Sequence, residues 1–301
     1  MKVVNYGSIN IDRVYQVDDL VKAGETKKVS AYYEYPGGKG LNQSVAMARG
    51  GLNIYHAGKI GRDGSHLISF LKDQGVCTDD IRQDEGASGH AIIQVDDRGE
   101  NSILVVGAAN ARITSEEKEE VLSKMEPGDV LLLQNEINGL EDFLSLARTR
   151  GITLVLNPSP LTPDLERIDF KYVDYLILNA HEALVLSKSA TIDQAMSYFL
   201  RKNEAIKLVV TLGDQGLVYQ DKDQTLKVPA ISVKPVDTTG AGDTFLGYFI
   251  SSLYRDCDLR HALELASYAA AMAVERPGAA SSIPYLNEVL DRIKDSSKLL
   301  P

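Results

Sequence analysis

The chain has few of the residues that mark a disulfide framework or a zinc site, with two cysteines and five histidines among 301 residues. Cys77 and Cys257 lie far apart and form no CxxC motif, which favours structural thiols in a reducing compartment such as the cytoplasm. The histidines lack zinc-ligand spacing. No apolar run is long enough to span a membrane, and the N-terminal apolar stretch is too short for a signal peptide and predicts a strand.

Positive charge is also scarce, because 42 aspartates and glutamates outnumber 32 lysines and arginines to give a net charge of −10 at pH 7. We therefore expect neither a nucleic acid nor an anionic membrane to be the main partner. Familiar phosphate and cofactor fingerprints are missing too. The turn at 37–40 lacks Walker A spacing, no GxGxxG follows the first predicted strand, and protein-kinase signatures are absent.

What the chain does contain is a regular alternation of short apolar runs and helical patterns. Because continuous Val, Ile and Leu runs alternate with helices, we predict a doubly wound α/β fold with a mostly parallel sheet covered on both faces. The length fits one large domain with a small appendage. Strands are predicted at 3–9, 53–59, 130–134, 153–157, 175–179 and 208–212, and helices at 40–50, 65–74, 139–148, from 180, and at 191–202.

Two stretches interrupt the alternation. Residues 27–35 have strand composition with no helix behind them, and residues 90–106 predict a hairpin that turns at 97–100. We expect a small inserted β-sheet, drawn from about 12–36 and 90–107, that acts as a lid over a cleft or as a docking surface. Its aromatic face, with Tyr32, Tyr33 and Tyr35, should need cover from the closed cleft or from a second subunit.

The most informative segment is Asp237-Thr-Thr-Gly-Ala-Gly-Asp243, between a strand-like run at 226–233 and a buried helix expected over 243–253. A small-residue turn at a helix N-terminus offers free N–H groups to an anion, and its glycines permit close approach. A carboxylate beside such an anion hole fits a base that deprotonates a hydroxyl attacking the held phosphate. The alternative is an ordinary aspartate N-cap after a glycine turn.

Polar side chains also gather at the predicted carboxyl ends of strands, the edge at which open parallel sheets bind ligands. Each alone is more simply a helix cap or a loop residue, but several together favour a site. They are Asn10, Asp12, Glu136, Asn157, Asn179, Glu182, Thr211, Gly213 and Asp214.

Together these residues resemble the PfkB family of carbohydrate kinases, and its ribokinase branch in particular, nearly end to end. The matching segments are 7–12 (Gly-Ser-Ile-Asn-Ile-Asp), 37–43, 156–160, 179–182, 211–213, 237–245 and 271–284. The resemblance implies a ribokinase-like domain over 1–301 that transfers the γ-phosphoryl group of ATP to the C5 hydroxyl of D-ribose. The alternatives are a related kinase for deoxyribose, fructose or a nucleoside, and a non-catalytic sugar-binding regulator. The intact turn, with Asp243, argues against the regulator.

The resemblance implies roles position by position. Asp243 would be the catalytic base, beside an anion hole made by Gly240, Ala241 and Gly242. The sugar would be held by Asn10, Asp12, Gly38, Lys39, Asn42, Glu136 and Asp243. The nucleotide would contact Asn179, Glu182, Thr211, Gly213 and Gly216, with Glu182 ordering Mg²⁺ through water. A potassium site would be formed by Asp237, Thr239, Ala273, Arg276, Gly278 and Ser282, several through their carbonyls.

The family also implies a homodimer formed through the small sheets. Three departures from its pattern bear on the choice of sugar and nucleotide rather than on phosphoryl transfer. Leu41 stands where a small residue is common, Ser267 stands near the adenine position where a histidine is frequent, and residues 106–110 differ from the usual lid sequence.

Overall fold

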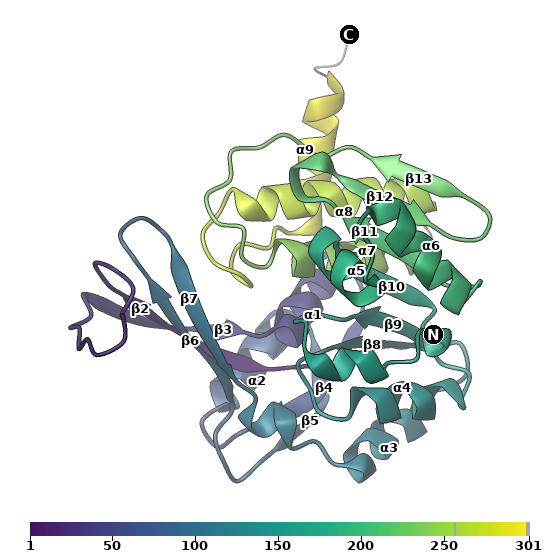
Figure 1. The fold of residues 1–301 in the computed structure, drawn as a ribbon. Coiled ribbons are helices and arrows are strands. Elements are labelled where there is room, and N and C mark those ends of the chain that lie inside the picture. Colours follow the sequence, from purple (N-terminus) through teal and green to yellow (C-terminus); the bar gives the residue numbers. More distant parts are fainter. Residues whose placement is uncertain (256, 299–301) are drawn as a thin grey trace.

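A nine-stranded sheet runs through the centre of the protein (Figure 1). The computed structural model describes residues 1–255 and 257–298. The strand order is β13-β12-β11-β10-β9-β8-β1-β4-β5, and neighbours are parallel except for the pairs β11–β12 and β12–β13. The strands are β1 (Val3–Tyr6), β4 (Ile54–Ile60), β5 (Cys77–Gln83), β8 (Val130–Gln134), β9 (Thr153–Asn157), β10 (Tyr175–Asn179), β11 (Lys207–Thr211), β12 (Leu217–Gln220) and β13 (Thr225–Val228).

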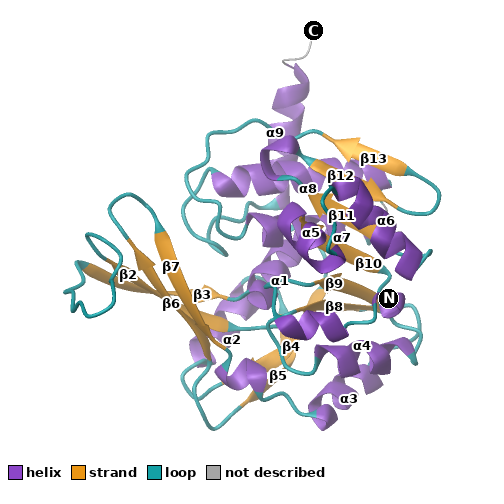
Figure 2. Ribbon diagram, in the orientation of Figure 1, coloured by secondary structure: helices purple, strands orange, loops and turns teal. Residues whose placement is uncertain are grey.

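Helices cover both faces of this sheet, as Figure 2 shows. Val3 of β1 packs in one hydrophobic cluster with α1, α2, α7, α8 and α9, whereas Val4 packs in the other with α3 to α6. Burial on both faces explains the continuous apolar runs and confirms the predicted α/β class. The helices are α1 (Lys39–Arg49), α2 (Ser65–Asp73), α3 (Ser115–Ser123), α4 (Leu140–Arg148), α5 (Ala180–Ser187), α6 (Ile192–Lys202), α7 (Ala241–Leu253), α8 (Leu259–Val274) and α9 (Leu286–Lys298), with 3₁₀ turns η1 (Ala108–Ala111), η2 (Pro163–Arg167), η3 (Phe170–Tyr172) and η4 (Gly213–Gln215).

The strand order reverses at β1, which pairs with β4 on one side and with β8 on the other. In open α/β sheets, ligands bind outside the carboxyl ends of the strands at such a reversal. Among the helices that the structure describes, none is long and apolar enough to cross a bilayer.

A second sheet projects from the large domain (Figures 1 and 2). Its order is β3-β2-β6-β7, with β2 (Asn10–Gln16), β3 (Ala31–Gly37), β6 (Gly89–Val95) and β7 (Asn101–Val106). The predicted first strand over 3–9 is too long, because β1 ends at Tyr6 and Asn10 already begins β2. Asn10 and Asp12 therefore lie within the small sheet rather than in a loop after the first strand.

The three tyrosines of β3 do not share one face, contrary to expectation. The rings of Tyr33 and Tyr35 stack with their centroids 6.0 Å apart, whereas Tyr32 packs 5.0 Å from Tyr15 of β2. Alternate residues of a strand point to opposite faces, so Tyr32 is separated from the other two. All three side chains are exposed, as are Ile103 to Val106 of β7.

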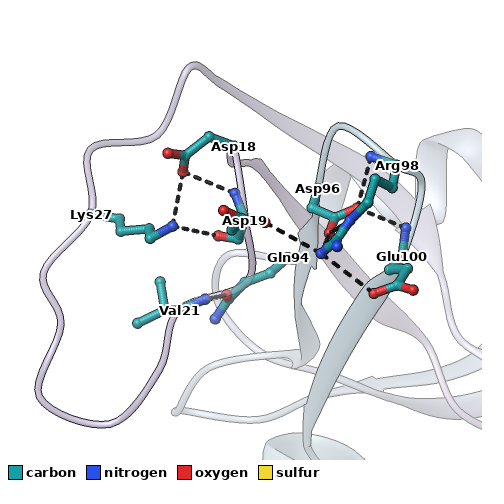
Figure 3. A network of polar contacts seen from close by, with 8 residues as sticks. All are labelled: Asp18, Asp19, Val21, Lys27, Gln94, Asp96, Arg98 and Glu100. Carbon is teal, nitrogen blue, oxygen red and sulfur yellow. Dashed lines mark hydrogen bonds and ion pairs between the residues drawn. The ribbon is translucent and has the colours of Figure 1, made fainter.

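Charged side chains fasten the outer end of the small sheet (Figure 3). The buried carboxylate of Asp96 accepts hydrogen bonds from the backbone N–H of Arg98 and from its guanidinium. Arg98 also reaches Asp19, at 3.3 Å, while Lys27 bonds to Asp18 at 3.1 Å and to the carbonyl of Asp19 at 3.2 Å. These contacts join the loop between β2 and β3 to the hairpin between β6 and β7.

The segment before α7 also differs from the prediction. The strand expected over 226–233 ends at Val228, because Pro229 has no N–H with which to continue the ladder, and residues 229–240 form a loop. Helix α7 begins at Ala241 rather than at Asp243, and its N-cap is Gly240, in the left-handed conformation with φ of 75°. The interpretation of Asp243 as an N-cap is therefore wrong.

Candidate active site

Four of the predicted sugar-binding residues form two hydrogen-bonded pairs near the carboxyl ends of β1 and β8. The backbone N–H of Lys39, at the start of α1, donates to Oε2 of Glu136 at 2.9 Å. One turn along α1, Nδ2 of Asn42 donates to Oδ2 of Asp243 in α7, at 3.2 Å. Segments from three parts of the sequence thus converge at the point where the strand order reverses.

The small sheet supplies the remaining sugar-side residues. Asn10 of β2 pairs with Gly37 of β3, and a Cβ atom on Gly38 would lie 3.1 Å from the backbone nitrogen of Asn10. Asp12 lies two residues further along β2, on the same face as Asn10. The structure therefore groups all seven predicted sugar-side residues at the junction of the two sheets.

Asp243 is buried in the first turn of α7, where the helix dipole favours a negative charge. Besides the bond from Asn42, its Oδ1 accepts a hydrogen bond of 2.8 Å from Nε2 of Gln43. Two adjacent residues of α1 therefore hold both oxygens of this carboxylate.

The sugar side of the site is crowded with carboxyl groups. Burial raises the pKa of Asp12 to about 7, with further contributions from the charges of Glu136 and Asp243. Burial also raises the pKa of Glu136, although bonds from Ser8 and Lys39 oppose this shift. The charge of Asp243 is the largest of the effects that raise the pKa of Lys39. Carboxylates that lack enough cations suit the hydroxyl donors of a polyol better than an anionic ligand.

The structure adds two buried residues that the sequence analysis did not assign to the site. The Ser8 hydroxyl donates to Oε2 of Glu136 and accepts a hydrogen bond from the backbone N–H of Gly40. Asn110 donates to Oδ1 of Asn10 at 2.7 Å and accepts from the N–H of Ile9 at 3.2 Å. Ser8 belongs to the Gly-Ser-Ile-Asn motif, which could have indicated it. Asn110 is about a hundred residues from its partners, so no local signal indicates it.

A cavity of about 520 Å³ lies at the N-terminal end of α7. Three predicted nucleotide-binding residues, Thr211, Gly213 and Gly216, line it, and so do Ala241 and Gly242 in the first turn of α7. Its other walls are mostly apolar and come from the loop before α7, from Phe245 of α7 and from α8, and of these residues only Ser267 was predicted to lie near the nucleotide. They include Ala230, Ile231, Val233, Pro235, Phe245, Ser267, Ala270, Ala271 and Val274.

Asn179 and Glu182 do not line this cavity. Asn179 caps α5 by accepting from the N–H of Glu182 at 2.9 Å, and Oε2 of Glu182 accepts from the N–H of Asn179 at the same distance. The Asn-x-x-Glu motif is therefore a capping box, which has a structural role of its own. The negative charge of Glu182 nevertheless makes a small contribution to the raised pKa of Lys39, after the larger effects of Asp243 and Glu136.

Most of the residues predicted to hold potassium lie in two loops, the one before α7 and the one after α8, whereas Ala273 lies in the last turn of α8. Asp237 accepts hydrogen bonds of 2.9 Å from the N–H groups of Thr239 and Gly278. Burial tends to raise the pKa of Asp237, but hydrogen bonding to the side chain of Thr239 and to the backbone of Thr239 and Gly278 outweighs burial and lowers it. The guanidinium of Arg276 binds Glu288 at 2.6 Å, and the Ser282 hydroxyl donates to the Ala279 carbonyl at 2.8 Å.

The donors at this place are a carboxylate, a hydroxyl and backbone carbonyls, which suit a weakly hydrated monovalent cation. Within 1–255 and 257–298, no group of three or more His, Cys, Asp or Glu side chains is placed to hold a metal ion.

Comparison with known proteins gives consistent matches over the whole chain. The profile of the pfkB family of carbohydrate kinases matches residues 1–286. Ribokinase from Bacillus subtilis is 36% identical over 290 residues, which cover 94% of this chain and 96% of that protein. The crystal structure of ribokinase from Thermotoga maritima superposes with a TM-score of 0.88 at 35% identity, covering 97% of this chain and 99% of that one. Ribokinase from Arabidopsis thaliana, complexed with ribose and ATP, gives a TM-score of 0.85 at 27% identity, with 97% and 98% covered.

Proposed function

Because the chain belongs to the pfkB family of carbohydrate kinases, we propose that it transfers the γ-phosphoryl group of ATP to the C5 hydroxyl of D-ribose. The observation that carries this proposal is the position of Asp243. It is hydrogen-bonded to α1 on the sugar side, and it follows directly after Ala241 and Gly242, which line the cavity. A base at this junction can reach a sugar hydroxyl and the end of a bound nucleotide together.

The sugar is held by groups that complement a polyol. The carboxylates of Asp12 and Glu136 accept hydrogen bonds from hydroxyls, while the amides of Asn10 and Asn42 can donate or accept. Gly38 brings backbone close to the sugar, and Lys39 offsets part of the surrounding negative charge. Such buried polar groups discriminate against a sugar that leaves them unpaired, which supports selection of a particular pentose.

In the chemical step, Asp243 takes the proton from the C5 hydroxyl as the hydroxyl oxygen attacks the γ-phosphorus. The new O–P bond forms as the bond between the γ-phosphorus and the β–γ bridging oxygen breaks, and ADP leaves. The N–H groups of Gly240 and Gly242 lie at the positive end of the α7 dipole and stabilise the charge on the transferring group, together with that of Ala241, which also donates to the carbonyl of Thr238 at 3.3 Å.

The nucleotide occupies the 520 Å³ cavity, with its base between the apolar walls and its phosphates at the N-terminus of α7. Thr211, Gly213 and Gly216 form one edge of this cavity. When bound, Mg²⁺ neutralises charge on the phosphates, and the Glu182 oxygen that does not cap α5 can hold it through water. Potassium between the loops of Asp237 and Gly278 would fix the turn that carries the anion hole.

The small sheet is proposed to act as a lid and as the dimer interface. Strand register puts Asp12 on the same face as two apolar cross-strand rows, made of Tyr35, Ala91 and Val105, and of Tyr33, Val14, Ile93 and Ile103. The inner end of this face meets the sugar, which leaves its exposed outer end to be covered. A second copy of the same face would cover it about a two-fold axis.

Cys77 and Cys257 are unbridged, which accords with a cytoplasmic location.

The proposal is tested by measuring ADP release from purified protein with ATP, Mg²⁺ and a panel of ribose, deoxyribose, fructose and nucleosides. We expect ribose to give the highest kcat/KM. A higher kcat/KM for another sugar would support the kinase activity but show that ribose is not the preferred substrate. If no sugar stimulates ADP release although ribose still binds by calorimetry, the protein is a regulator rather than an enzyme.

A further inference from the structure

A continuous chain of buried amide side chains runs from the backbone of α1 to Asp243. Gln43, Gln134 and Asn5 are completely buried. Gln134 donates from Nε2 to Oε1 of Gln43 at 2.7 Å and to Oδ1 of Asn5 at 2.9 Å. Nε2 of Gln43 then donates to Oδ1 of Asp243 at 2.8 Å. Polar groups of this kind are costly to bury, so a connected set beside a reactive carboxylate calls for a reason.

The orientation of each amide is fixed by a backbone carbonyl. Nδ2 of Asn5 donates to the carbonyl of Gly40 at 2.7 Å, an atom that can only accept. The Oδ1 atom of Asn5 must therefore face Gln134, so Gln134 presents its NH₂ group both to Asn5 and to Gln43. Rotating any one of these amides by half a turn would bring two oxygens together.

A second carbonyl fixes Gln43 from the other side. Asn157 donates from Nδ2 to the carbonyl of Ile177 at 2.9 Å, which turns its Oδ1 towards Nε2 of Gln43 at 3.2 Å. The contacts from Gln134 and Asn157 thus independently fix the same orientation of the Gln43 amide. The NH₂ group of Gln43 points at Asp243, and the carbonyl oxygen of Gln43 points away.

The arrangement is retained although one atom of it is unsatisfied. Oε1 of Gln134 is buried and has no hydrogen-bond partner within the described part of the chain. A Cβ atom on Gly7 would lie only 2.2 Å from it, so glycine at position 7 makes room for this oxygen. Buried unsatisfied groups are rare in proteins and tend to occur where function constrains the side chain.

On the basis of the proposed function, we infer that Gln43 is a positioning residue for the base, with its amide oriented by Gln134 and Asn157. Its N–H donates to Oδ1 of Asp243 and fixes the rotation of the carboxylate. Oδ2, which is held by Asn42 through a longer bond of 3.2 Å, is then the oxygen that faces the sugar hydroxyl.

Replacing Gln43 by glutamate tests this inference, because the shape is kept and the donor becomes an acidic oxygen. Two carboxyl groups at 2.8 Å share a proton, so the base should be free only at higher pH. Other charges near Asp243 come from Asp12, Glu136 and Lys39, and the substitution leaves them in place. We expect Gln43→Glu to move the acid limb of the kcat–pH profile to higher pH by roughly one unit or more, with activity recovering under alkaline conditions.

A second set of variants separates positioning from folding. Gln43→Met should reduce kcat by roughly 10- to 100-fold with little change in ribose KM, because the carboxylate remains present but loses its orientation. Gln134→Met should have a smaller effect, and the double variant should be no slower than Gln43→Met, because Gln134 acts only through Gln43. Asn203→Asp is the matched amide-to-carboxyl control, since Asn203 bonds to the carbonyl of Val173 away from the site.

The outcomes are distinct. An acid limb of Gln43→Glu that superposes on that of the wild type, or effects of the two methionine substitutions that simply add, would overturn the positioning role. If Gln134→Met fails to fold, the pH profile of Gln43→Glu still tests whether Gln43 positions the base. A wild-type protein without sugar-dependent turnover would overturn the proposed function and this inference with it. Wild-type turnover with an unshifted Gln43→Glu profile would overturn the inference alone.

Discussion

Asn42 and Asp243 are 201 positions apart in the sequence, yet Nδ2 of the asparagine donates to Oδ2 of the aspartate at 3.2 Å. The bond joins the first turn of α1 to the first turn of α7. Since the glycine turn before α1 faces the sugar side and the turn before α7 faces the nucleotide cavity, this contact connects the two halves of the proposed site.

Ribose binding is expected to weaken below neutral pH. The pKa of Asp12 is raised to about 7 by burial and by Glu136 and Asp243, so the carboxylate that should accept sugar hydroxyls becomes protonated as the pH falls. We predict that ribose KM rises as the pH is lowered through 7. Initial rates at several ribose concentrations across this range would measure it, and a flat KM would contradict the role given to Asp12.

The same group links pH to stability. The ordinary pKa of this carboxyl is 3.8, so between that value and about 7 the folded state binds a proton that the unfolded state has released. The contribution of Asp12 to the free energy of unfolding therefore falls as pH rises through this window. Above about pH 7 this loss of stability no longer grows, because Asp12 is ionised in both states. Asp12→Asn should raise the melting temperature by a few degrees in alkaline buffer and less in acid. Equal shifts at both pH values would count against an ionised Asp12.

The core of the fold could be predicted because buried parallel strands leave a clear pattern. The bounds of β8, β9 and β10 match those predicted, since each is a continuous apolar run between helices. Strand β5 was not predicted. It lies at one edge of the sheet, where only one neighbour pairs with it, and its sequence, Cys-Thr-Asp-Asp-Ile-Arg-Gln, is mostly polar.

The candidate site was predictable where its residues lie in local motifs. Lys39, Asn42 and Asp243 belong to two glycine turns, and the structure brings these turns together. The bond between Gln43 and Gln134 was not predicted, because the two residues are 91 positions apart. In the sequence, Gln134 is simply a polar residue at the end of an apolar strand. The walls of the nucleotide cavity were missed for a similar reason, because isolated apolar residues in a loop carry no period.

Magnesium dependence should respond to Glu182. Glutamine at this position can still accept from the N–H of Asn179 and complete the capping box, so the fold should be kept. The loss of charge should raise the Mg²⁺ concentration for half-maximal rate by roughly tenfold or more, with little effect on ribose KM. A magnesium titration at saturating ribose measures this. A variant whose only defect is a raised ribose KM would show that Glu182 serves the sugar instead.

Activity should depend on potassium. Asp237 bridges the loop before α7 to Gly278, and the carbonyl oxygens of Val274 and Ala279 lie in the adjoining backbone, where they accept hydrogen bonds from Val236 and Ser282. Rates measured in chloride salts at matched ionic strength should be highest with K⁺ and lower with Na⁺ or Li⁺, whose hydration shells are held more tightly. Equal rates in all three salts would show that activity does not depend on which monovalent cation is present.

Association should depend on the face of the small sheet that carries Asp12. Tyr33 lies on this face and Tyr32 on the opposite one, so the two residues form a matched pair. We expect Tyr33→Lys to raise the dimer dissociation constant by about tenfold or more, because it buries a charge, whereas Tyr32→Lys should change it little. Light scattering across a concentration series distinguishes them. A wild-type protein that is monomeric at micromolar concentration would exclude the dimer.

The most direct test of Asp243 as the catalytic base is sugar-dependent ADP release by the wild type and by Asp243→Asn, with melting curves to verify that both proteins are folded. The substitution keeps the shape of the side chain and removes the base. We predict that ribose stimulates ADP release by the wild type and that kcat falls by about 10² to 10⁴ in the variant. Near-normal turnover by a folded Asp243→Asn protein would contradict the central claim that Asp243 deprotonates the sugar.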